Sequence, residues 1–188
     1  MARLPNATSE QFGELIRQSG IPQNTPQTNA FRTLAHAPRI AAPVLRLVLA
    51  LLTETDLDPR LRELVILQVA QRCEGGYVWL QHVPIAAIVG VGEAQVKALE
   101  RGAAPPSLFV DRERTMFAFV DEVLDTCTVR DETFVAVREM FSAGEILELL
   151  LLIGYFRMVS TVMTTLQVEL EPSFGVKILD MVRETACR

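Results

Sequence analysis

A helix start near the middle of the chain constrains the fold most. In the pair Asp58-Pro59, the aspartate can cap free backbone N–H groups and proline suits the first helical position. The residues that follow are apolar on both flanks of a helix, so the spacing predicts a central helix as far as about Cys73. The pair Gly75-Gly76 then ends it. A helix that is apolar on two sides must be surrounded by other elements.

The rest of the chain also shows helical periodicity. No alternating pattern longer than four or five residues indicates a strand. Capping residues, apolar spacing, glycine and proline predict further helices at about 9–19, 29–36, 39–53, 77–90, 92–100, 111–125, 131–141, 142–167 and 176–183. The sequence therefore predicts an all-α protein.

The composition changes near residue 28. Residues 1–28 are rich in proline, asparagine and glutamine, with one helical piece closed by Gly20. This pattern predicts an N-terminal arm that packs on the body or on a neighbouring subunit. Residues 29–188 are then the helical domain, and 188 residues are enough for one domain with such an arm.

Charge and composition exclude several classes of partner. The net charge is −5, there is no basic run, and aromatic residues are 6% of the chain, so we expect no nucleic-acid partner. The apolar runs at 41–52 and 146–156 contain charged residues and are shorter than the roughly 20 residues of a membrane span. The N-terminus lacks an apolar signal core, and three distant cysteines do not suggest a disulfide scaffold. We therefore expect a cytoplasmic protein without a membrane partner.

Glu63 is a carboxylate placed among apolar neighbours. Pro59, Ile66, Leu67 and Ala70 lie one helical turn from it. Loss of hydration favours the neutral form of a carboxylate, which suits a general acid or base near neutral pH. The alternative, favoured by the sequence alone, is a structural carboxylate paired with Arg60 or Arg62 or capping a nearby helix end.

His82 lies on an apolar stripe of the following helix. A histidine there is more often a packed core residue, but it is also the side chain best suited to shuttle protons near neutrality. The second histidine, His36, is far away, and neither histidine lies in a metal-binding spacing, so we expect no metal site.

Four neighbouring residues are weaker candidates. Cys73 is a candidate redox residue, because a thiol near a helix start can have a lowered pKa, although an inert core cysteine is the favoured alternative. Tyr77 and Trp79 are either core residues or walls of a substrate pocket. Arg72 is a candidate anchor for a substrate anion.

Several stretches resemble the carboxymuconolactone decarboxylase family, whose fold is related to alkylhydroperoxidase D. They are N-x-F-R-T-L-A-H at 29–36, L-D-P-R-L-R-E-L-V-I-L at 57–67, R-C-x-x-x-Y-x-W-x-x-H-V-P-I-A at 72–86, and G-Y-F at 154–156. The resemblance extends over about 29–171. It implies an alkylhydroperoxidase D-like helical bundle that forms homotrimers or hexamers, with its site in a crevice between helices near a subunit contact.

The resemblance implies roles for two residues, whereas other functional residues of the family are absent from this chain. Glu63 and His82 match the glutamate and histidine of the redox branch, but the two cysteines of its C-x-x-C pair fall on Gly75 and Val78. A related branch has Tyr-Glu-Trp where this chain has Tyr77-Val78-Trp79. A dithiol relay needs two neighbouring sulfurs, so that chemistry is not expected here.

Together these features predict a cofactor-free enzyme resembling a carboxy-lyase. His82 and Glu63 would decarboxylate or isomerise a small carboxylated lactone or a related acid, with Tyr77 and Trp79 as walls and Arg72 as anchor. Two alternatives remain open: an alkylhydroperoxidase-like thiol redox protein using Cys73, and a non-catalytic oligomeric module.

Overall fold

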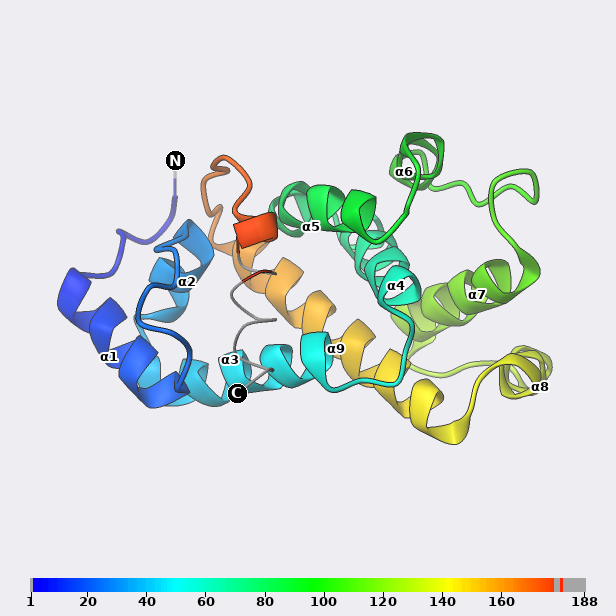
Figure 1. Cartoon of the computed structure of the whole chain (residues 1–188), viewed down its shortest axis with the longest axis horizontal. Helices are drawn as coiled ribbons and strands as arrows, with labels where there is room; N and C mark the ends of the chain where they lie inside the picture. Colours follow the sequence, from blue (N-terminus) through cyan, green and yellow to red (C-terminus); the bar gives the residue numbers. More distant parts are fainter. Residues whose placement is uncertain (1, 178–179, 181–188) are drawn as a thin grey trace.

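The computed structural model describes residues 2–177 and residue 180, and this part of the chain contains helices without any strand. The prediction of an all-α protein is confirmed. The helices are α1 (Ser9–Ser19), α2 (Asn29–Leu34), α3 (Pro38–Thr53), α4 (Pro59–Arg72), α5 (Gly76–Ile88), α6 (Glu93–Glu100), α7 (Asp111–Thr126), α8 (Asp131–Met140) and α9 (Ala143–Thr165) (Figure 1). The predicted last helix over 176–183 lies mostly outside the described residues, as does Cys187.

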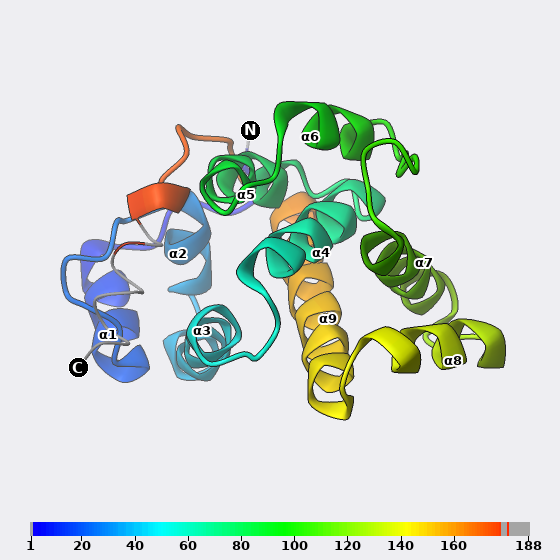
Figure 2. The same ribbon diagram turned by 45° about the vertical axis from the view of Figure 1, so that its right-hand side comes forward.

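Helix α4 is the centre of the fold. The Asp58 side chain accepts hydrogen bonds from the backbone N–H groups of Arg60 and Leu61, and Pro59 occupies the first turn, as the sequence predicted. Every residue from Leu61 to Ala70 is buried. The helix contacts α5, α6, α7 and α9, and Figure 2 shows it crossing α9. A helix surrounded on this scale must be apolar on more than one side.

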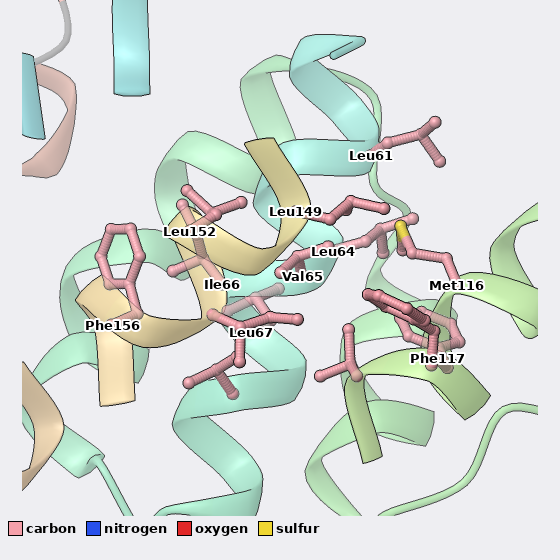
Figure 3. Packing of buried hydrophobic residues seen from close by; sticks show 14 of the residues in the cluster. Leu61, Leu64, Val65, Ile66, Leu67, Met116, Phe117, Leu149, Leu152 and Phe156 are labelled. Carbon is pink, nitrogen blue, oxygen red and sulfur yellow. The ribbon is translucent and has the colours of Figure 1, made fainter. Parts of the chain in front are cut away.

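The main core forms where α4 meets α7 and α9. Figure 3 shows side chains of α4 packed between Met116 and Phe117 of α7 and Leu149, Leu152 and Phe156 of α9. Truncation of a fully buried leucine in such a core to alanine costs about 2–5 kcal/mol. This rigid core fixes the position of α4 and of any side chain that α4 carries.

A second, smaller hydrophobic cluster lies at the N-terminal end. Helix α1 begins with a capping box formed by Thr8 and Gln11, and packs on α3. The buried members come from both sides of residue 28: Ala7, Phe12, Leu15, Ile16, Ile21, Ala35, Ala41, Ala42 and Leu45. The N-terminal residues are thus packed against α3 within the same chain, while the domain boundary at 28/29 stays a prediction.

Helix α9 is long and largely apolar. Its capping box, formed by Ser142 and Glu145, was predicted from the sequence. By length and hydropathy it meets the requirements of a membrane-spanning helix, a test that the core helix of a soluble protein also passes. Here one face of α9 packs against α3, α4, α5, α7 and α8, and another face is exposed.

The segment after α9 folds back over α5. The carboxylate of Glu171 accepts hydrogen bonds from the backbone N–H of Asn29 at 2.6 Å and from the Tyr77 hydroxyl. The backbone N–H of Phe174 donates to Oε1 of Gln81 at 2.8 Å. These contacts tie the C-terminal segment to α2 and α5, beside the site described next.

Candidate functional site

Helices α4 and α5 bring Glu63 and His82 together. The tight connection between them uses Glu74 at φ 51° and the pair Gly75-Gly76, so the two helices pack against each other. Nδ1 of His82 lies 2.9 Å from Oε2 of Glu63. The two residues are 19 positions apart in sequence and form a hydrogen-bonded pair in the structure.

Glu63 is completely buried, and its two oxygens differ in their partners. Oε2 faces His82, whereas Oε1 is inaccessible to solvent and has no hydrogen bond. The closest cationic atom to Oε1 is Nε of Arg62, at 3.8 Å, which is longer than a hydrogen bond. Of the two arginines considered as partners, Arg62 lies at ion-pair distance, whereas Arg60 bonds Glu113 on α7. Glu63 thus retains an unused acceptor in a site shielded from water.

His82 is held in one orientation by Glu63 and by an aromatic neighbour. Its ring meets Phe156 edge to face, with 5.0 Å between ring centroids. Its side chain is 12% exposed. When Glu63 is ionised it accepts the Nδ1–H, which leaves the Nε2 lone pair free to take a proton.

A cavity of about 130 Å³ adjoins the pair. It lies between the main core and the N-terminal cluster, with walls from α2, α3, α4, α5, α9 and the C-terminal segment. Most of the walls are apolar, and the polar side chains among the described lining residues are few. The lining residues are Thr28, Ala30, Phe31, Leu34, Leu45, Val48, Leu52, Glu63, Tyr77, Val78, Gln81, His82, Ile85, Tyr155, Phe156, Val159, Met163 and Gly175.

Two tyrosines line this cavity and differ in their hydrogen bonds. The Tyr77 hydroxyl donates to Glu171 and accepts from the backbone N–H of Ala30 at 3.2 Å. Burial, followed by the Glu171 hydrogen bond, raises the pKa of Tyr77. The hydroxyl of Tyr155 has no hydrogen-bond partner among the described residues, and burial alone raises its pKa. Both phenols therefore stay protonated at neutral pH.

Gln81 is a cavity residue that the sequence analysis did not identify. It is 7% exposed; its Oε1 accepts from Phe174, and its buried Nε2 has no partner. Gly175 lies so close that an added Cβ would come within 2.1 Å of the Gln81 carbonyl oxygen. The one feature of the sequence that could have identified Gln81 is that it is an amide next to His82 on an otherwise apolar helix. Its contact with a segment more than 90 residues away was not readable from local spacing.

Two predicted substrate-binding residues lie away from the cavity. Arg72 forms ion pairs with Asp121, at 3.2 Å, and Asp125 on α7. It follows Glu63 by nine residues, which places it about half a turn away on the opposite face of α4. Trp79 lines a separate shallow groove with Gln71 and Glu100. The structure thus brings Tyr77 to the Glu63–His82 pair and does not bring Arg72 or Trp79.

Cys73 is also outside the cavity. It ends α4, is partly buried against the main core, and burial raises the pKa of its thiol despite Arg157 and Arg72. This direction is opposite to the lowered pKa that a redox role would need and is consistent with the favoured alternative of an inert core cysteine. At Gly75, where the resemblance places a first cysteine, an added Cβ would lie 2.4 Å from Oγ of Ser160. Helix α9 thus occupies the space that a side chain would need at this position.

The described residues contain no group of three His, Cys, Asp or Glu side chains arranged to hold a metal ion. The pair of Glu63 and His82 has the chemistry of a general acid and base, because a buried carboxylate orients an imidazole whose second nitrogen remains available.

Comparisons with known proteins agree with this fold. Residues 38–122, which include both Glu63 and His82, match the model of the carboxymuconolactone decarboxylase family. No curated protein sequence matches the chain.

Three solved structures share the fold. The alkylhydroperoxidase AhpD core of Ralstonia eutropha JMP134, an uncharacterized peroxidase-related protein, is 18% identical, with a TM-score of 0.73 over 93% of this chain and 95% of that one. A protein of unknown function from Agrobacterium tumefaciens, assigned provisionally to AhpD-type antioxidant defence, is 19% identical, with a TM-score of 0.67 over 72% and 93%. An uncharacterized peroxidase-related protein from Silicibacter sp. TM1040 is 16% identical, with a TM-score of 0.65 over 77% and 78%.

At these identities the solved structures establish a common architecture, and the predicted AhpD-like helical fold is confirmed. Residues 38–122 are thus similar to the carboxymuconolactone decarboxylase family, and the chain as a whole has the fold of AhpD-like proteins.

Proposed function

We propose that the chain is a cofactor-free acid–base enzyme that isomerises or decarboxylates a small lactone or a related carbonyl compound. The observation that carries this proposal is the 2.9 Å contact between Nδ1 of His82 and the buried carboxylate of Glu63 at the wall of a cavity. A free imidazole nitrogen held beside a cavity is placed to move a proton on a bound molecule.

The reaction needs only one residue to exchange protons with the substrate. Nε2 of His82 removes a proton from a carbon next to a carbonyl. The electron pair of that C–H bond forms a C=C bond, and the carbonyl π pair moves to oxygen. In a β,γ-unsaturated carbonyl compound this gives a dienolate; when the enolate C–O π bond re-forms, the electron pair shifts to the γ carbon, which takes the proton from His82 and completes an isomerisation to the α,β-unsaturated compound. Glu63 stabilises the imidazolium that exists between the two steps, which is worth more in a site without water.

A decarboxylation would use the same pair in the other direction. The bond to the departing carboxylate breaks, its electron pair forms the enolate as CO2 leaves, and protonated His82 supplies the proton to carbon. The predicted anchor for the substrate carboxylate, Arg72, is engaged with Asp121 and Asp125 instead. The geometry therefore supports proton transfer more strongly than it supports recognition of an acid.

The experiment that tests the namesake reaction is loss of carboxymuconolactone with release of CO2. It compares the wild-type protein with His82→Ala under reducing conditions. Turnover that collapses in the variant supports decarboxylation by this pair. Equal turnover by the two proteins contradicts the role proposed for His82.

The two alternatives have less support. Thiol redox chemistry at Cys73 would need an accessible thiolate, whereas burial raises the pKa of this thiol and the residue lies outside the cavity. A solvent-inaccessible His82 without an adjoining cavity would favour a non-catalytic module. His82 instead lines one and retains an exposed fraction of its side chain.

We further propose that copies of the chain associate through α9. Its exposed apolar residues recur at helical spacing and form a stripe: Leu147, Leu150, Leu151 and Met158. A homotrimer or hexamer in the cytoplasm is the expected state. Light scattering after size-exclusion chromatography tests it, with Leu151→Glu expected to dissociate the assembly. A monomeric wild-type protein contradicts the proposal.

A further inference from the structure

Two hydrogen-bond donors in the cavity have no partner. Nε2 of Gln81 is a buried atom without a hydrogen bond, and desolvation is the only contribution to the raised pKa of Tyr155, with no hydrogen bond among its causes. Both side chains are more than nine-tenths buried, and both line the cavity that contains His82. A buried donor left without an acceptor costs about 1–3 kcal/mol, which applies to Nε2 of Gln81.

The orientation of the Gln81 amide is fixed by the C-terminal segment. Because the N–H of Phe174 donates to Oε1, the opposite end of the amide is the NH₂ group, which can only donate. Tyr155 stays protonated because burial raises its pKa, so it also offers a hydrogen to a ligand. The cavity therefore presents two neutral donors, which complement an acceptor such as a carbonyl oxygen.

The rest of the cavity restricts the ligand further. Its volume, about 130 Å³, is near that of an apolar cavity of about 150 Å³ that holds benzene. Phe31, Leu34, Val48 and Met163 are among its apolar walls. The carboxylate of Glu63, with one oxygen unbonded, disfavours a second negative charge nearby. A small ring or short chain fits these walls better than a polyanion does.

We propose that Gln81 and Tyr155 are the residues that determine specificity in this cavity, and that they hydrogen-bond the carbonyl oxygen of a small, uncharged, largely apolar ketone or lactone. This inference rests on the isomerisation form of the proposed function and names its substrate class, since a substrate that loses CO2 would carry a carboxylate. The same two donors would stabilise the enolate oxygen that forms when His82 removes a proton from the adjacent carbon.

Binding measurements test this inference without requiring turnover. The probes are cyclohexanone, toluene, which has the same number of non-hydrogen atoms but no acceptor, and benzoate, which is negatively charged. Ligand-observed NMR titration with the full-length wild-type protein gives the three affinities. We expect cyclohexanone to bind at least about fivefold more tightly than toluene, corresponding to one net hydrogen bond, and benzoate to bind most weakly.

Two conservative variants assign the effect to the named residues. Tyr155→Phe removes one hydroxyl, and Gln81→Met keeps the length of the side chain while removing the NH₂ donor together with the acceptor for Phe174. Each is expected to weaken cyclohexanone binding about fivefold and to leave toluene binding within about twofold, as loss of one hydrogen bond requires. Circular dichroism checks that each variant keeps the helical content of the wild type.

The outcomes separate this inference from the proposed function. Tighter binding of benzoate than of cyclohexanone, or equal loss of cyclohexanone and toluene binding in both variants, overturns the inference. If cyclohexanone binds as expected but the protein catalyses no proton exchange on it, the recognition site stands and the acid–base function fails. Efficient turnover of carboxymuconolactone, a dicarboxylate, would support the function and contradict the uncharged substrate class.

Discussion

Two buried glutamates on neighbouring helices have opposite surroundings. Glu113 of α7 accepts hydrogen bonds from Arg60 and from the backbone N–H of Val110, at 3.1 Å for the latter. Arg60 in turn bonds the Gly90 carbonyl and Gln95, so every group in this cluster has a partner. Glu63 of α4 is hydrogen-bonded to His82 through one oxygen, whereas its second oxygen has only a 3.8 Å contact with Nε of Arg62 and no hydrogen bond.

The difference separates a structural carboxylate from a candidate catalytic one. Around Glu113 the charges and donors are matched, so the cluster stabilises the packing of α4, α6 and α7. Around Glu63 one carboxylate oxygen has no hydrogen-bond donor. This costs stability and leaves an acceptor that a ligand could use. Burial alone does not distinguish the two, since Glu113 is 2% exposed and Glu63 is 0% exposed.

The largest expected effect is on catalysis at Glu63. Glu63→Gln removes the charge that holds the His82 tautomer, so proton transfer is expected to fall at least about 100-fold. The free energy of unfolding is expected to change by less than about 1 kcal/mol, because the lost charge was incompletely paired. Exchange rates and urea denaturation measure the two quantities. A loss of stability above about 2 kcal/mol with unchanged catalysis would assign Glu63 to the structure.

Glu113→Gln is expected to have the opposite pattern, with a loss of stability and no change in catalysis. Glu113→Gln leaves the Arg60 guanidinium without its anionic partner, and we expect the free energy of unfolding to fall by about 2 kcal/mol. Proton transfer by the folded protein should be unchanged. Urea denaturation followed by circular dichroism gives the first value. A substitution here that is neutral for stability would contradict the contrast between the two clusters.

The two cavity tyrosines provide a smaller version of this contrast. Tyr77→Phe breaks the hydrogen bonds to Glu171 and Ala30 and is expected to cost about 1 kcal/mol of unfolding free energy. Tyr155→Phe removes a hydroxyl without a partner, so stability should stay within about 0.5 kcal/mol or rise. Thermal denaturation of both variants measures the difference. Equal destabilisation would indicate that the Tyr155 hydroxyl has a partner after all.

The smallest effect concerns the thiol of Cys73. Because burial raises its pKa, its thiolate fraction at neutral pH is lower than that of an ordinary cysteine and increases only as the pH is raised. We expect iodoacetamide to modify exposed Cys127 well before Cys73 at pH 7, with Cys73 catching up at alkaline pH. Peptide mass spectrometry resolves the two sites. Rapid modification of Cys73 at pH 7 would revive the thiol redox alternative.

The helices were predictable because their ends carry strong local signals. Asp58-Pro59 and the Ser142–Glu145 capping box fixed two starts, and the observed bounds of most predicted helices differ by no more than two residues. The pairing of Glu63 with His82 was expected from the family resemblance. The spacing of the two residues in the sequence does not predict this pairing, because the pairing depends on how α4 and α5 pack.

The remaining site residues depended on helical phase and on distant contacts. Arg72 was assigned to the site by its closeness in sequence, but its position half a turn from Glu63 directs it to α7. Gln81 acquires its role only when Phe174 fixes its amide, and Tyr155 only when the surrounding helices leave its hydroxyl without a partner. Such roles arise from tertiary packing, which the sequence pattern does not specify.

Deuterium uptake at the carbons next to the carbonyl of cyclohexanone is a direct measure of proton transfer by the Glu63–His82 pair. The rate in D₂O is compared for wild type, Glu63→Gln and Glu113→Gln at equal concentrations of folded protein. We expect exchange faster than in protein-free buffer for wild type and Glu113→Gln, and near the buffer rate for Glu63→Gln. Exchange by wild type at the buffer rate, or equal rates for all three proteins, would contradict this expectation.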